Sequence, residues 1–335
     1  MLRRVPSSRR GSSLTLGVAR TRDTGRVPDR NAPADPDLVA ALADFARRVA
    51  GRTGSPAVLS HRTGELVLRC GAVVVKAHAA GTDRDTLNAR LDLAESARLR
   101  EVLLAPLARG DVDGRPVTVW PAGKALRPDD AFDAPWDVAG TLLARLHAVE
   151  PPGPVPTTGG PARVTRALRR LAASPAWPGP RSRTVLAAYE MLPAWTRGAG
   201  AQPRAVLTHG DWHLGQLVRV AEGWRLIDVD ELGTGEPAWD LARPAAWFAA
   251  GVMPPRLWDR FLGAYRAAGG VAVPPDGDPW PVLDAPARAL AVQTAALAVV
   301  NADLDVAEAF VACCRRMNGL EPIRYVRTLS KLLRV

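Results

Sequence analysis

Residues 207–217 have the sequence LTHGDWHLGQL, and residues 224–230 have the sequence WRLIDVD. The first segment places a carboxylate, Asp211, in a loop and an amide, Gln216, five residues later, and the second segment ends in two more carboxylates. Phosphoryl transfer uses one carboxylate to orient the attacking hydroxyl and further oxygen ligands to hold magnesium on the nucleotide. Each acid alone would more often be an ordinary turn residue. The complete set in this order indicates phosphoryl transfer.

These segments resemble the aminoglycoside phosphotransferase and choline kinase-like family of small-molecule kinases. The similarity rests on HGDWHLGQ at 209–216 and LIDVDELGTGEPAWDLA at 226–242, with LLARLHA at 142–148 in support, and it covers most of residues 37–320. The family has the two-lobed protein-kinase fold. The resemblance therefore implies an α+β chain with a small β-rich N-terminal lobe, a larger helical C-terminal lobe, and ATP and Mg²⁺ in the site.

The resemblance also implies a role for each polar residue of the two segments. Asp211 matches the catalytic aspartate, which accepts or orients the proton of the substrate hydroxyl. Gln216 and Asp228 match the magnesium ligands, although the family usually has Asn where this chain has Gln216. Asp240 matches the buried acid that holds the catalytic loop, while Asp230 matches no role.

Lys76 lies inside the apolar run 72–77, AVVVKA, and only three of the 44 basic residues are lysines. A buried ammonium group without a partner is costly, so Lys76 should face an anion unless it extends to water from an edge strand. The family places its phosphate-contacting lysine on this strand. By the same resemblance, the acid that orients the lysine is Glu95 on the following helix, with Glu101 as second choice.

Residues 120–124 match the hinge of the family, where backbone groups contact the adenine. The resemblance therefore implies that Trp120 and Ala122 contribute to the nucleotide site. The loop that covers the phosphates is expected at the first hairpin turn, 61–64, although this turn has no Gly-rich motif.

The alternation of apolar and turn residues divides the chain into a β-rich part and a helical part. Before residue 120 it predicts helices at 38–49 and 83–104 and strands at 57–60, 65–69, 72–78 and 115–120. After residue 123 it predicts short strands at 216–220 and 224–228 and helices at 136–149, 239–250, 255–268, 284–300, 304–317 and 321–333. The expected organisation is a disordered Arg- and Ser-rich tail at 1–36, a nucleotide lobe at 37–119, a hinge at 120–124, and a helical lobe at 125–335 with the catalytic loop and the acceptor site.

Composition excludes several other classes of protein. With 335 residues, 47% hydrophobic and 23% charged, the chain can build a sizeable core. Half of the net charge of +10 lies in residues 1–36, and the rest is dispersed, so we expect no nucleic-acid partner. The three cysteines form no disulfide or zinc pattern, and the longest apolar run is too short to span a bilayer. We therefore expect a cytoplasmic protein without a membrane partner.

The expected activity is ATP-dependent phosphorylation of a hydroxyl group on a small molecule, with an aminoglycoside-type antibiotic as one acceptor and antibiotic resistance as its role. An aminoglycoside is a polycation and would require an acidic pocket. The positive net charge of the chain argues mildly against such an acceptor. The candidate acids are Glu231, Glu236, Asp303, Asp305 and Glu308. Two alternatives stay open: a sugar or amino-sugar kinase of the maltokinase-like branch, which the HLGQ sequence resembles, and a catalytically silent binding module with the kinase fold.

Overall fold

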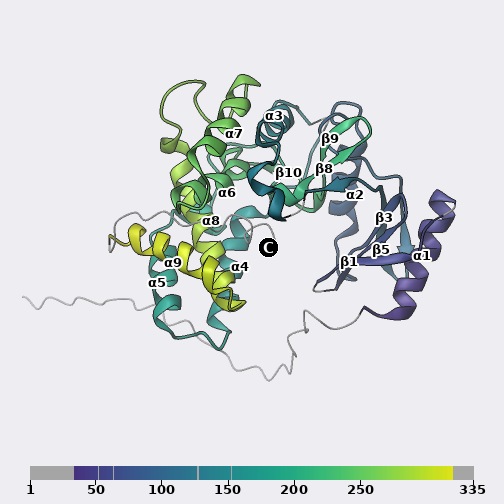
Figure 1. Ribbon diagram of the computed structural model, residues 1–335, viewed down its shortest axis with the longest axis horizontal. Coiled ribbons are helices and arrows are strands. Elements are labelled where there is room, and N and C mark those ends of the chain that lie inside the picture. Colours follow the sequence, from purple (N-terminus) through teal and green to yellow (C-terminus); the bar gives the residue numbers. More distant parts are fainter. Residues whose placement is uncertain (1–33, 52, 63, 127, 152, 320–335) are drawn as a thin grey trace, which may run out of the picture.

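A computed structural model describes residues 34–319 of the protein, except 52, 63, 127 and 152 (Figure 1). The helix expected at 321–333 and nearly all of the tail expected at 1–36 lie outside the described residues. The fold is α+β, as predicted, with an antiparallel sheet at one end and a larger group of helices at the other (Figure 1).

The N-terminal sheet has five antiparallel strands in the order β1-β2-β3-β5-β4. Their bounds are β1 (Pro56–Arg62), β2 (Glu65–Cys70), β3 (Val73–Ala77), β4 (Ala108–Val112) and β5 (Arg115–Pro121). Helix α1 (Pro36–Ala50) covers one face, where its buried Leu42 packs with Leu68 and Val75. Because side chains alternate along a strand, Lys76 lies on the opposite face, toward the helical part. β4 was not predicted.

The long helix predicted at 83–104 is wrong in its second half. Helix α2 (Arg84–Glu95) ends at Glu95, and the chain continues in turns. There the backbone N–H of Leu104 donates to the carbonyl of Leu226, whose own N–H donates to the carbonyl of Val102. The apolar residues of this segment remain buried, but the backbone leaves the helix to pair with the end of a strand from the C-terminal part.

The C-terminal part contains the helices predicted at 136–149, 239–250, 255–268, 284–300 and 304–317, each within a few residues. They are α3 (Trp136–His147), α6 (Ala238–Ala249), α7 (Pro255–Ala267), α8 (Trp280–Val300) and α9 (Leu304–Met317). The structure adds α4 (Gly160–Ala172) and α5 (Pro180–Glu190). Short strands pair in two small sheets, β10-β7 and β6-β8-β9. These are β6 (Lys124–Ala125), β7 (Val206–Thr208), β8 (Leu217–Val220), β9 (Gly223–Leu226) and β10 (Gly233–Gly235).

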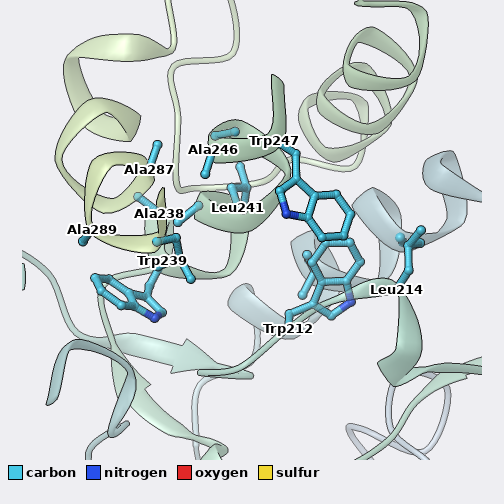
Figure 2. Packing of buried hydrophobic residues seen from close by; sticks show 14 of the residues in the cluster. Trp212, Leu214, Ala238, Trp239, Leu241, Ala246, Trp247, Ala287 and Ala289 are labelled. Carbon is cyan, nitrogen blue, oxygen red and sulfur yellow. The ribbon is translucent and has the colours of Figure 1, made fainter. Parts of the chain in front are cut away.

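A cluster of aromatic rings anchors the segment that carries Asp211. Trp212 stacks on Phe261, with ring centroids 5.3 Å apart, and both lie edge-to-face against Trp136. Figure 2 shows Trp212 and Trp247 of α6 among the buried residues of this core, and Trp247 also lies edge-to-face against Trp136. Because aromatic pairs of this kind add to the stability from buried area, the residue next to Asp211 is fixed in the core.

Helix α8 is the one described helix with the length and apolarity of a membrane span, at a mean hydropathy of 1.3 over its best window. That window is 67% buried inside the protein. α8 packs against α4, α6 and α9, as the core helix of a folded domain does.

Candidate active site

The loop after β7 is held in place by the buried carboxylate of Asp240, at the start of α6. Its two oxygens accept the backbone N–H groups of His209, at 2.6 Å, and Gly210, at 2.8 Å. His147 Nε2 lies 3.1 Å from the same carboxylate, and its Nδ1 lies 2.8 Å from the hydroxyl of Tyr265. Burial alone would raise the pKa of Asp240, but these hydrogen bonds outweigh burial and lower it.

Gly210 is required by the shape of this loop. Its φ of +80° is in the left-handed region, and an added Cβ would lie 2.4 Å from the carbonyl oxygen of Glu231. Only glycine avoids both the strain and the clash. The close contact fixes the loop that carries Asp211 against the segment that follows β9.

The two motif segments are also joined directly. His209 Nε2 lies 2.9 Å from the carbonyl oxygen of Ile227, and the N–H of Ile227 donates to the carbonyl of Gln216 at 2.9 Å. Asp228 follows with φ +64° and ψ +72°, a backbone conformation rare outside glycine. Backbone strain of this kind is concentrated at functional sites.

Lys76 is brought to these segments from β3. Its Nζ donates to Asp228 Oδ1 at 2.9 Å and to Asp230 Oδ2 at 2.5 Å. Burial alone would lower the pKa of Lys76, but the two carboxylates outweigh burial and raise it. Burial would raise the pKa of Asp228, but Lys76 and the amide of Gln216 hold it well below its usual range. Lys76 is therefore a charged, buried lysine and not an edge residue that extends to water.

The ion pair predicted between Lys76 and Glu95 is wrong. Glu95 lies at the end of α2, where both its oxygens bind Arg109 of β4, at 2.8 and 3.1 Å. Glu101, the second choice, lines a different groove of the protein. Asp230, for which the sequence suggested no role, takes the place next to Lys76.

A cavity of about 290 Å³ lies between the N-terminal sheet and the motif segments. Among its lining residues are Val74, Lys76, Trp120, Gln216 and Asp228. Four of the sequence-predicted residues, Lys76, Trp120, Gln216 and Asp228, therefore share one cavity.

Ala122 does not contribute as the resemblance implied. Its backbone N–H donates to the carbonyl of Ala72 at 2.8 Å, so it is not free to bind a base. Trp120, Pro121 and Gly123 line the cavity at this point instead. The loop expected to cover the phosphates, 61–64, includes residue 63, which lies outside the described residues.

Gln216 and Asp228 are in contact, with Gln216 Nε2 donating to Asp228 Oδ2 at 2.9 Å. A carboxylate and an amide that carries a carbonyl oxygen are ligand types that Mg²⁺ prefers. The strong depression of the Asp228 pKa keeps this carboxylate ionised, as a metal ligand must be. The donor set therefore fits a divalent cation held together with nucleotide phosphates.

Asp211 binds two arginines that the sequence analysis did not single out. Arg163 of α4 and Arg243 of α6 both reach Asp211 Oδ1 with Nη2, at 3.0 and 3.2 Å. Arg163 also donates to the carbonyl of Gly210 at 2.5 Å. Arg243 follows Asp240 by three residues, so the two side chains lie on the same face of one helix. This spacing was the sequence signal that could have placed Arg243 near the loop.

Three of the five acids expected to form an acidic acceptor pocket have other partners. Glu231 binds Arg163 and the N–H of Gly159, at 3.1 and 2.9 Å. Glu236 is buried, and Asp303 accepts the N–H of Val306 at the start of α9. Glu231 is therefore already paired with a cation.

Known proteins support this interpretation of the fold. The family model described as phosphotransferase enzyme family matches residues 71–282. Three similar solved structures are a choline/ethanolamine kinase family protein from Mesorhizobium loti, a microcompartment-associated aminopropanol kinase, and a thermostable mutant of the aminoglycoside phosphotransferase APH(4)-Ia.

These three structures cover 85%, 85% and 84% of this chain and 93%, 99% and 100% of their own, with TM-scores of 0.56, 0.59 and 0.55. The sequence identities are 17%, 17% and 13%, so this structural similarity shows a shared fold. Among curated proteins, no sequence matches. Because the family model spans most of the chain and includes both motif segments, the chain belongs to the phosphotransferase enzyme family and has the fold of its small-molecule kinases.

Proposed function

We propose that the protein transfers the γ-phosphoryl group of ATP, with Mg²⁺, to a hydroxyl group of a small molecule. The observation that carries this proposal is the contact of Lys76 Nζ with Asp228 at the wall of the cavity, where Asp228 also meets Gln216. A cation, an acid and an amide oxygen at one point are the groups that a metal-bound triphosphate requires.

Lys76 would bind the phosphates of the nucleotide. The charge of Lys76 is balanced by Asp228 and Asp230, at 2.9 and 2.5 Å. Gln216 and Asp228 would hold Mg²⁺, which neutralises charge on the phosphates when it is bound. With Asp228 holding the cation, Lys76 would exchange part of its contact with Asp228 for contacts with phosphate oxygens.

Asp211 would orient the acceptor hydroxyl. Both arginine contacts of Asp211 go to Oδ1, so Oδ2 is the oxygen that would accept the hydroxyl hydrogen bond. The hydrogen bonds from the loop to Asp240 fix the position of Asp211 before substrate binds. Such positioning supplies much of the catalysis in phosphoryl transfer.

A cytoplasmic location agrees with the three cysteines, which are free and buried. An aminoglycoside acceptor has less support, because Glu231, one of the acids expected to bind its amino groups, pairs with Arg163 and the N–H of Gly159.

The test is an acceptor screen that follows ADP formation, with ³¹P NMR of the product. We expect one class of alcohols to give a phosphate monoester, and we expect Asp211→Asn to lower kcat by about 100-fold or more while binding MgATP normally. ADP release that is independent of every acceptor and unchanged in Asp211→Asn would exclude the proposed role of Asp211.

A further inference from the structure

Four guanidinium groups from three separate helices gather around Asp211 and Glu231. Arg163 and Arg243 bind its Oδ1, and Arg166, one turn after Arg163 on α4, lies 4.0 Å from Glu231. Arg90 of α2 donates to the carbonyl of Leu232 at 3.0 Å. We call Arg90, Arg163, Arg166 and Arg243 the arginine cluster.

The carboxylates within the arginine cluster do not balance its charge. Asp211 and Glu231 pair with Arg163, Arg166 and Arg243. Arg90 also lies near two further carboxylates, Asp230, which Lys76 already binds, and Asp83, which accepts a hydrogen bond from Thr86. One carboxylate oxygen of Glu231 also accepts a hydrogen bond from the N–H of Gly159. The surface beside the proposed acceptor hydroxyl therefore carries an excess of positive charge.

Burial makes the charged form of these arginines less favourable. Burial lowers the pKa of Arg243, and only Asp211 raises it, while Arg163 lowers it further. The side chains of Arg163 and Arg243 are only 16% and 12% exposed. The Nε atoms of both are buried without a hydrogen-bond partner among the described residues. Guanidinium groups that are buried close together require anionic partners.

A role in holding the loop explains one arginine but not the cluster. Arg163 connects the carbonyl of Gly210, Asp211 and Glu231, which is sufficient to fix the catalytic loop against α4. Arg166 adds nothing to that contact, because it is 57% exposed and its nearest carboxylate oxygen lies at 4.0 Å. An arginine in this state is able to bind an oxyanion from solution.

We propose that the acceptor alcohol carries an oxyanion, a carboxylate or a phosphate, and that the arginine cluster binds it while the hydroxyl meets Asp211 Oδ2. This inference rests on the proposed function. In the reaction, the acceptor oxygen forms a bond to the γ-phosphorus and the bond from that phosphorus to the β,γ-bridging oxygen breaks. ADP leaves, and the hydroxyl proton passes to Asp211 and then to solvent. The acceptor is of opposite charge to the amino alcohols named for the similar structures.

The test measures anion binding with the nucleotide site filled. The protein is saturated with Mg²⁺ and the non-hydrolysable analogue AMP-PNP, and inorganic phosphate or malonate is titrated by calorimetry at constant ionic strength. We expect saturable binding to the wild type and binding at least 10-fold weaker to Arg166→Gln. Arg169→Gln removes an exposed guanidinium from the same helix and should leave binding unchanged. Comparing the affinities for phosphate and malonate distinguishes a site for a phosphate group from a site for a carboxylate.

A second readout uses acceptor pairs that differ only in the anion: glycerate or glycerol 3-phosphate against glycerol, and homoserine against 3-amino-1-propanol. The inference predicts that in any pair that reacts, the anionic member has the higher kcat/KM, and that Arg166→Gln raises its KM more than it lowers kcat. Faster phosphorylation of the neutral or cationic member would overturn it, as would equal anion binding by wild type and Arg166→Gln, or none by the wild type.

The outcome also separates this inference from the proposed function. Anion binding with MgADP but not with Mg²⁺ and AMP-PNP would mean that the arginines bind the γ-phosphate. That result would contradict the proposed acceptor site but not the proposed function. Failure of the wild type to bind MgATP at all would contradict the proposed function itself.

Discussion

Lys76 Nζ lies 2.9 Å from Asp228 Oδ1, and this contact joins β3 of the N-terminal sheet to the loop after β9. The two residues are 152 positions apart in the chain. Their contact crosses the cavity between the two parts of the fold, so the charge state of one residue depends on the other.

The first prediction concerns the amide partner of this pair. Gln216→Asn shortens the side chain by one methylene and weakens the 2.9 Å hydrogen bond to Asp228. Because Asn is the residue that the family usually has here, we expect turnover within a few-fold of wild type. Gln216→Leu keeps the volume but removes the oxygen, and it should raise the Mg²⁺ concentration for half-maximal activity by 10-fold or more. The same Mg²⁺ dependence in all three proteins would show that Gln216 is not a ligand.

The second prediction concerns Gly210. Gly210→Ala places a Cβ 2.4 Å from the carbonyl oxygen of Glu231 at a φ of +80°. We expect the free energy of unfolding in urea to fall by about 2 kcal/mol or more and activity to be lost. Gly263→Ala on α7 is the control, because nothing lies within 4 Å of its added Cβ and alanine favours helix. Equal stability of the two variants would contradict the close contact.

The third prediction concerns Asp240. Asp240→Ala leaves the N–H groups of His209 and Gly210 and the ring of His147 without their acceptor in a buried site. Removal of one partner from such a network costs roughly 3 kcal/mol, which denaturant unfolding would measure. Asp240→Asn retains one acceptor oxygen and should be less destabilised. If both variants unfold like wild type, Asp240 does not hold the loop.

The fourth prediction concerns pH. Burial lowers the pKa of His213 to about 4, and its Nδ1 accepts the N–H of Gly215 at 3.0 Å. Below its ordinary pKa of about 6.5 the unfolded chain binds a proton that the folded chain does not. The free energy of unfolding should therefore fall as the pH decreases from about 6.5 to about 4, by no more than about 3 kcal/mol.

His213→Asn supplies the control for this pH dependence. Asn retains an acceptor for the N–H of Gly215 and does not titrate, so the difference in unfolding free energy between the two proteins should change only below about pH 6.5. A constant difference from pH 8 to pH 4 would show that His213 titrates alike in the folded and unfolded chains.

The sequence predicted the parts of the site that depend on local chemistry. Asp211, Gln216 and Asp228 lie in short segments in which loop, strand and turn residues follow in a fixed order. Lys76 was found because an ammonium group in an apolar strand requires an anion. The structure supplies that anion as Asp228.

The sequence did not predict contacts that depend on the placement of whole elements. Glu95 was expected at Lys76 because it follows β3 on the next helix, but α2 ends there and Arg109 binds it. The arginine cluster was missed because arginines are abundant in this chain. Only the packing of α4 and α6 around the loop that carries Asp211 distinguishes Arg163 and Arg243 from the others.

The most direct test of the account is the shift in melting temperature that MgATP causes in wild type, Lys76→Met and Lys124→Met. Lys124 is exposed on β6 and serves as the lysine control. We expect MgATP to stabilise wild type and Lys124→Met by several degrees and to leave Lys76→Met nearly unchanged. Equal stabilisation of Lys76→Met and wild type would contradict the assignment of the nucleotide site.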